Sequence, residues 1–212
     1  MKRARCIAVF PLLAAAAAIS GGASEARADD PRPPLEVVRE LVATIRALEP
    51  PKDGEKLSAA REQKNARIVE KAHAALDIDG LARRALGPTW KDLRPAQREE
   101  ALELLRRSFA EIAYPQSAKF FGELDLDYRD AGPRGDQHVI AVAVSHPDEG
   151  LIDLEFFLEK VDGRWKVVDL HLDMVSLALD IQSQMRKIVI DDGVDELLRR
   201  MRSKLEEESE SD

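Results

Sequence analysis

The amino-acid sequence predicts an α+β domain: a curved, four-stranded antiparallel sheet with helices packed over it. Two observations lead to this prediction. Apolar residues recur at helical spacing up to about residue 112, and the period changes to strand-like alternation from residue 124. Helical spacing then returns after residue 176. No internal repeat interrupts this order, and the predicted single domain spans residues 29–205.

Four helices are expected before the sheet. Gly87 and Pro88 stop the third of them, because glycine ends helices and proline cannot continue them. Pro95 suits the first position of the fourth helix, and Pro115 is expected to end it. The expected helical ranges are 35–45, 55–76, 77–86 and 95–112.

Four strands are expected next, joined as an antiparallel meander. The third alternates almost strictly between apolar and polar residues, so one of its faces should be buried. Asp162-Gly163 is a hairpin signal between the third and fourth strands. The expected strand ranges are 124–128, 139–144, 152–159 and 165–172.

Two helices are expected after the sheet. Ser176 can cap the first, which runs to about Ile188, and Gly193 separates it from a last helix over 194–201. Residues 206–212 are acidic and Ser-rich and contain nothing apolar to bury. We therefore expect this segment to be a disordered tail.

The first 28 residues have the order of a cleaved secretory signal. A basic start is followed by the apolar run Ile7 to Ile19, which is too short to span a bilayer comfortably. Ala26 and Ala28 supply the small residues of a cleavage site. The sequence therefore predicts export, and a mature chain without cysteine, since Cys6 leaves with the signal. We expect no stable membrane insertion of the mature protein.

Charge and residue spacing argue against several classes of function. Removing residues 1–28 changes the formal net charge from −8 to about −11, which disfavours nucleic acid and tight adsorption to anionic lipid. No paired ligand spacing or phosphate-binding loop occurs, so we expect no metal site, cofactor or catalytic residue. The four histidines considered as ligands are His73, His138, His146 and His171.

Three stretches of the chain together resemble the MlaC family, also known as toluene-tolerance auxiliary proteins. They are 85–98, with Ala-Leu-Gly, Trp-Lys and Pro-Ala-Gln-Arg; 162–169, Asp-Gly-Arg-Trp-Lys-Val-Val-Asp; and 175–201, which opens with Val-Ser-Leu. The chain departs from the family where Met174 replaces a usual glycine. Ile181-Gln182 stand in place of a Tyr-Arg pair, and Arg94 in place of a helix-opening Thr or Ser.

The resemblance implies a periplasmic carrier with phospholipid as its cargo and a fold similar to the nuclear-transport-factor-2 cone. A carrier has no need to be more than a monomer, which is the state we expect. It also implies partners: an outer-membrane lipoprotein–porin complex and an inner-membrane ABC transporter, between which lipid moves to maintain outer-membrane asymmetry. Two acyl chains carry roughly 30 methylenes, each costing about 0.8 kcal/mol to expose to water. A carrier therefore needs a dry cavity, larger than the roughly 300–1,000 Å³ of ordinary ligand pockets.

The apolar strand faces and the facing helices are the candidate wall of such a cavity. On pattern alone these residues are typical of an ordinary core, and only the resemblance favours a cavity wall. The predicted lipid-binding residues are Phe109, Ile112, Ile140, Val142, Val144, Ile152, Leu154, Phe156, Leu158, Val168, Leu170, Leu172 and Leu177.

Two other functions stay open at this point. Asp169, His171 and Asp173 alternate along one strand, where they could serve as an acid–base group of an isomerase or dehydratase. Strand alternation places them on the face opposite Val168 and Leu170, away from the predicted cavity. A periplasmic adaptor or chaperone with a solid core is the other alternative, with the arginine clusters as its binding surface.

Overall fold

The computed structural model describes residues 32–51, 55–122, 124–147 and 150–211. The predicted signal peptide, 1–28, lies outside the described residues. The helices are α1 (Pro34–Arg46), α2 (Ala59–Ala75), α3 (Ile78–Leu86), α4 (Thr89–Asp92), α5 (Pro95–Ser108), the π-helix η1 (Phe109–Ala113), α6 (Tyr114–Phe121), α7 (Leu177–Asp192) and α8 (Val194–Ser211). The strands are β1 (Asp125–Arg134), β2 (Gln137–His146), β3 (Gly150–Val161), β4 (Arg164–Leu172) and β5 (Val175–Ser176).

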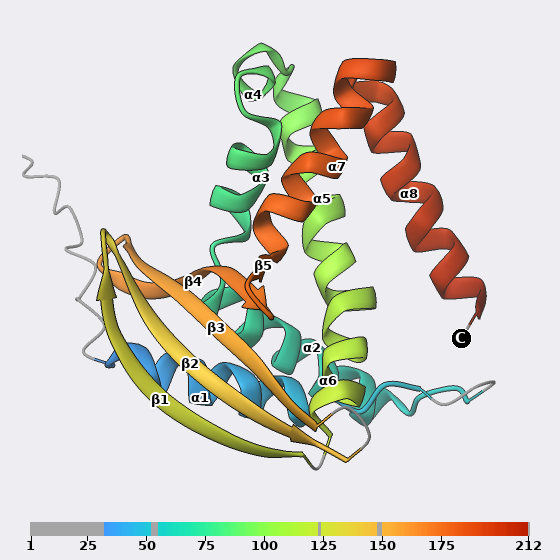
Figure 1. Cartoon of the computed structure of the whole chain (residues 1–212). Helices are drawn as coiled ribbons and strands as arrows, with labels where there is room; N and C mark the ends of the chain where they lie inside the picture. The colour runs from blue at the N-terminus through green and yellow to red at the C-terminus, as the bar shows by residue number, and fades with distance from the viewer. Residues whose placement is uncertain (1–31, 52–54, 123, 148–149, 212) are drawn as a thin grey trace, which may run out of the picture.

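The strands form one antiparallel meander in the order β1-β2-β3-β4-β5. This confirms the predicted α+β class, with a fifth strand of two residues added to the expected four. The sheet curves around α1 and α2, whereas α3, α5, α7 and α8 stand together beside it as a helical lobe (Figure 1). Chain order therefore places α7 directly after the sheet, where it joins the two parts.

Each of these two parts has a large apolar cluster of its own. The first lies between the sheet and the α1 face that carries Val38 and Val42, both at most 1% exposed. The second lies within the helical lobe, where Leu197, Leu198 and Leu205 of α8 are buried. Each cluster gives one part of the fold its own core, so the space where the parts meet is bordered by apolar side chains from both.

Pro115 does not end the helix that begins at Pro95, contrary to the prediction. The chain passes through the π-helical turn η1 and continues as α6, in which Pro115 occupies the first turn. A proline at that position is tolerated, because the wider i→i+5 pattern before it leaves no i→i−4 bond for its missing N–H. The continuation carries Phe121 into the core against the sheet.

Strand alternation fails at one position of β4. Leu158 of β3 pairs with Val167, whereas Phe157 pairs with Asp169, so Val168 is an extra residue in a β-bulge. The Val168 side chain packs with Phe157 on the face of the sheet away from the main core. The prediction that Val168 and Leu170 share one face is therefore wrong, and Val167 takes the core-facing place.

A tight hairpin joins β4 to β5. Leu172 pairs with Val175, and the two residues between them, Asp173 and Met174, have φ angles of 47° and 68°. Positive φ at both central residues defines a type I′ turn, which favours Asn-Gly or Asp-Gly. Aspartate tolerates this region, but methionine has no side-chain group that compensates for the Cβ clash. The Met174 side chain is 90% exposed, so packing does not account for it.

Met174→Gly is expected to stabilise the protein. Glycine adopts positive φ without strain, so the free energy of unfolding should rise by about 1 kcal/mol. Urea denaturation of the two proteins measures the difference. Met174→Ala is the matched control: it removes the same exposed side chain but keeps the strained Cβ, and it should gain nothing. Equal stability of all three proteins would contradict the strain argument.

The C-terminal segment 206–211 continues α8 as a helix, where the sequence led us to expect disorder. Buried Leu205, 1% exposed, anchors the preceding turn. Lys204 pairs with Glu208 at 3.0 Å, one helical turn further along (i,i+4). Glutamate is also a good helix former, so an acidic tail attached to an anchored helix can extend it without burying apolar surface.

Candidate ligand cavity

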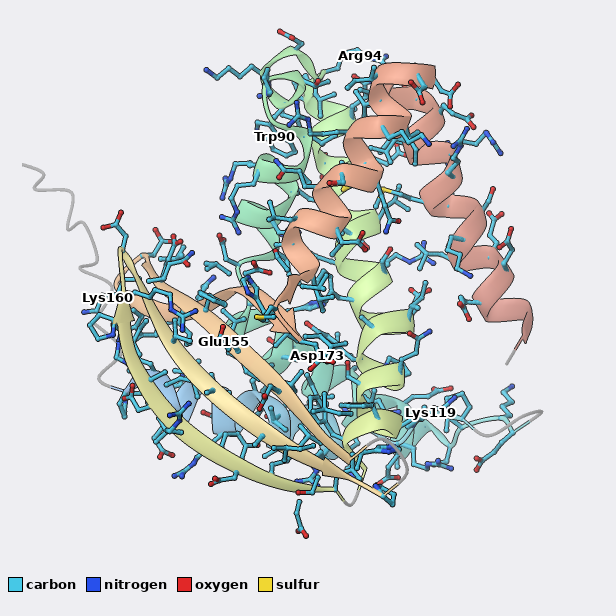
Figure 2. All side chains as sticks on the ribbon, in the orientation of Figure 1. Trp90, Arg94, Lys119, Glu155, Lys160 and Asp173 are labelled. Atoms are coloured by element: carbon cyan, nitrogen blue, oxygen red, sulfur yellow. The ribbon has the colours of Figure 1, made fainter. Side chains whose placement is uncertain are left out.

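A cavity of about 350 Å³ lies where the sheet, α1 and α6 meet the helical lobe. Its wall is almost entirely apolar and comes from helices on both sides as well as from β3 and β4. The lining residues are Leu41, Val42, Ile45, Leu76, Asp77, Ile78, Leu81, Leu105, Ser108, Phe109, Ala113, Tyr114, Ser117, Phe121, Phe156, Val167, Val168, Asp169, Leu170, Leu177, Ala178 and Ile181. The first turns of α7 close one side of this space, next to the hairpin that carries Asp173 (Figure 2).

Asp77 is a buried charged group at the cavity wall, 8% exposed. Its carboxylate caps α3 by accepting the Gly80 N–H at 3.1 Å, and it also accepts Arg84 Nη1 at 3.0 Å. Arg84 Nη2 donates in turn to the Val168 carbonyl at 3.4 Å. Because its charge is paired and hydrogen-bonded, Asp77 fixes α3 to β4 and leaves the cavity lining apolar in character.

Asp169 also borders the cavity, contrary to the expectation that it lies away from it, although it pairs with Phe157 and so stays on the face of β4 opposite Leu170. Its Oδ2 accepts the Ser176 hydroxyl at 2.6 Å and lies 3.0 Å from His171 Nε2. Its Oδ1 accepts the backbone N–H groups of Leu170, at 2.8 Å, and Ala178, at 3.0 Å. Four partners saturate this carboxylate, so its geometry suits a clamp that holds the start of α7 on β4.

The proposed acid–base trio does not come together at the cavity. His171 is absent from the lining, and its ring packs against Phe157 with centroids 4.2 Å apart. Asp173 is carried into the hairpin turn, where its side chain is exposed. Only Asp169 of the three touches the cavity, and its lone pairs are already used. This arrangement offers no free base to a bound substrate.

Five of the thirteen predicted lipid-binding residues line the cavity: Phe109, Phe156, Val168, Leu170 and Leu177. The rest lie elsewhere, in three kinds of place. Leu172 is 39% exposed at the end of β4, and Ile112 packs within the helical lobe. The others are buried in the main core, namely Ile140, Val142, Val144, Ile152, Leu154 and Leu158.

The sequence reasoning placed Phe109 and Leu177 in the helical part of the wall but missed most of that part. Leu41, Val42 and Ile45 of α1 line the cavity, as do Leu81 of α3 and Phe121 of α6. The helical spacing of these residues predicts a buried face, but a buried face packs against solid core and cavity in the same way. The one available signal was the amphipathic pattern of α1, which marks its inner face without saying what that face meets.

His73 and Tyr114 form a buried polar pair, of which Tyr114 lines the cavity. Their rings lie 5.4 Å apart, and among the described residues neither His73 Nε2 nor the Tyr114 hydroxyl has a hydrogen-bond partner. Burial lowers the pKa of His73 below its usual value of 6.5 and raises that of Tyr114. Both groups are therefore neutral in the folded protein at pH 7.

This pair predicts a loss of stability in acid. The unfolded chain takes up a proton on His73 near pH 6.5, whereas the folded protein resists it, so stability falls as the pH drops below that value. His73→Gln cannot titrate, and its melting temperature should fall less than that of the wild type between pH 7.5 and 5.5. Thermal unfolding of both proteins across this range measures the effect; parallel curves would contradict it.

Within the described residues, no group of three or more His, Cys, Asp or Glu side chains is placed to hold a metal ion. Nor does any helix in that part of the chain combine the length and apolar character needed to cross a membrane.

The fold and the site together define an α+β protein in which a curved antiparallel sheet and a helical lobe border an apolar cavity. The chain belongs to the MlaC family: the family profile, described as MlaC protein, matches residues 40–203. This match confirms the resemblance that the three sequence stretches indicated. No curated protein matches the chain in sequence.

A solved structure similar to this chain is that of a phospholipid-binding protein from Ralstonia solanacearum in complex with a phospholipid. The two structures align with a TM-score of 0.64 at 17% sequence identity, over 82% of this chain and 95% of that chain. At this identity the likeness concerns the fold, and it extends to nearly the whole of the compared protein.

Proposed function

We propose that this protein is a periplasmic phospholipid carrier that holds acyl chains in the cavity between the sheet and the helical lobe. The observation that carries the proposal is the apolar lining, in which the two carboxylates, Asp77 and Asp169, are occupied by partners of their own. Membership of the MlaC family and the phospholipid bound by the similar Ralstonia protein both support this choice of ligand.

An enclosed apolar wall is what lipid transfer through water requires. Exposing two acyl chains to water costs on the order of 20 kcal/mol. A flat surface would leave most of that cost in place, whereas side chains from β3, β4, α1 and α6 line this half-open cavity and remove part of it. An unpaired polar group in the wall opposes binding, because its own desolvation goes uncompensated, and the Tyr114 hydroxyl, which has no partner among the described residues, is such a group.

The volume of the cavity limits how much lipid the protein can hold in this conformation. A cavity of about 350 Å³ lies at the small end of the size range of ligand pockets. The sequence analysis expected a cavity larger than that range. At roughly 30 Å³ per water-sized group, it holds about a dozen such groups, or most of one acyl chain. Two chains therefore require the wall to move outward. The first turns of α7 are the part of the wall suited to this, since Leu177 and Ala178 are not fully buried.

The proposed role is transfer without chemistry. Asp169 is saturated with hydrogen-bond donors, and among the described residues no group of three or more His, Cys, Asp or Glu side chains is placed to hold a metal ion. We further propose that the carrier acts as a monomer after export by the signal peptide 1–28. Family membership supports partners at the outer membrane and at an inner-membrane ABC transporter, between which the lipid would move.

Gentle purification followed by solvent extraction tests the proposal. The mature protein should bring phospholipid with it at close to one molecule per chain, identified by mass spectrometry. Delipidated protein incubated with phosphatidylethanolamine vesicles should recover the same ratio. Protein that carries no lipid after either procedure would rule out the carrier function and leave the adaptor as the better description.

A further inference from the structure

Five large apolar side chains are exposed within eight consecutive residues at the β4–β5 hairpin and the start of α7. Met174 is 90% exposed, Leu179 61% and Val175 60%. Leu172 and Leu177 are each 39% exposed. We name these five residues the mouth patch. Scattered single apolar residues are normal on protein surfaces, but a concentration of this kind marks a contact site.

The mouth patch is continuous with the cavity. Leu177 belongs to both: it lines the cavity and is also exposed, and its neighbour Ala178 lines the cavity too. The hairpin carries Leu172, Met174 and Val175 to the place where the sheet meets the helical lobe, as the position of Asp173 in Figure 2 shows. A molecule that covers the mouth patch therefore also covers this side of the cavity.

The patch is bordered by negative charge. Asp173 lies within it, Asp180 follows it on α7, and Asp153 of β3 lies beside the hairpin, where its carbonyl accepts the Asp173 N–H at 3.1 Å. All three side chains are exposed. No lysine or arginine occurs between Lys166 and Arg186. The surface thus has an apolar centre and an acidic border.

This charge pattern selects among possible occupants. A second copy in a two-fold contact would place the patch against itself, so carboxylates would face carboxylates. A bilayer with anionic lipid would be repelled by the same groups. A protein surface with an apolar centre and a border of lysine or arginine complements the patch in both respects.

We propose that the mouth patch is the docking surface for a partner protein whose own face is apolar and fringed with basic residues. The inference rests on the proposed function, because it gives the contact a purpose: it keeps water from the cavity mouth while an acyl chain passes. Met174 at the tip of the turn is the most exposed anchor, and the carboxylates set the orientation of the partner.

Photo-crosslinking of the full chain in its own host tests the proposal. A benzoylphenylalanine at position 179 should crosslink to a protein, and the crosslinked peptide should be apolar with flanking Lys or Arg. Ile190 is the matched control, since it is 74% exposed on the same helix but lies outside the patch. The same partner captured equally from both positions, or no protein captured from position 179, would overturn the proposal.

Binding measurements with the identified partner complete the test. Met174→Gly preserves the turn but removes the anchor, and it should weaken binding at least tenfold. The double variant Asp173→Asn and Asp180→Asn removes charge at nearly constant shape, and it should weaken binding about five- to tenfold at low salt, with little effect at high salt. Unchanged affinity in these variants would overturn the proposal.

Two further readouts separate this inference from the proposed function. Both patch variants should keep the wild-type amount of bound phospholipid. Wild-type protein that carries lipid but binds no partner would overturn the docking surface and leave the proposed function intact. Sedimentation with phosphatidylcholine vesicles, with and without phosphatidylglycerol, addresses a membrane. Vesicle binding that Met174→Gly abolishes would make the patch a bilayer contact instead.

Discussion

Ala178→Trp is expected to empty the cavity of lipid while the protein stays folded. Ala178 lies in the first turn of α7, half-buried, with its side chain at the cavity wall. An indole at this position can occupy the existing space of about 350 Å³, so it need not displace packed core atoms. An acyl chain cannot share that space. Bound phospholipid per chain should therefore fall at least tenfold, as measured by extraction and mass spectrometry.

Leu179→Trp provides the matched control for this experiment. It places the same side chain one residue further along α7, where the native side chain is 61% exposed and does not line the cavity. Lipid content should then equal that of the wild type, and circular dichroism should show both variants folded. If Ala178→Trp retained a full complement of lipid, the acyl chains would have to lie somewhere other than this cavity.

Much of the fold could be predicted because its determinants are local. Asp162-Gly163 specified the β3–β4 hairpin, and the structure gives these residues φ angles of 51° and 77°. Ser176 was expected to cap α7, and its hydroxyl accepts the Leu179 N–H at 3.0 Å. Gly193 separates α7 from α8 as expected. Each of these signals depends on one or two residues whose backbone preferences decide the outcome.

The errors arose where tertiary contacts override local preference. Pro115 reads as a helix stop, but a π-turn before it lets the helix continue. The bulge at Val168 leaves no mark in a run of apolar residues, and it reverses the faces of the residues before it on β4. The cavity wall was only partly predicted for a related reason. A buried leucine that faces space and one that faces another leucine carry the same sequence pattern.

Gly80→Ala is expected to destabilise the protein by about 2–4 kcal/mol, although the same change in an ordinary helix gains about 1 kcal/mol. A Cβ on Gly80 would lie 1.7 Å from Asp77 Oδ2 and 2.7 Å from Arg84 Nη1. The carboxylate must therefore leave its place, which breaks both the cap of α3 and the ion pair with Arg84. A lost cap costs about 1 kcal/mol, and a buried charge without its partner costs more.

A double-mutant cycle in urea distinguishes this mechanism from general crowding. Asp77→Ala should be destabilising by itself, since it removes the cap, but in that background Gly80→Ala no longer meets a carboxylate. Its cost should fall to near zero or become a gain, which gives a coupling energy of at least about 2 kcal/mol. Additive effects would show that the methyl group clashes with something other than Asp77.

The change at Gly80 should also affect the cavity, because Asp77 lies in its wall and connects α3 to β4. The Asp77 N–H donates to the Val167 carbonyl at 2.9 Å. Gly80→Ala should therefore loosen the cavity wall and lower the amount of phospholipid that the protein retains.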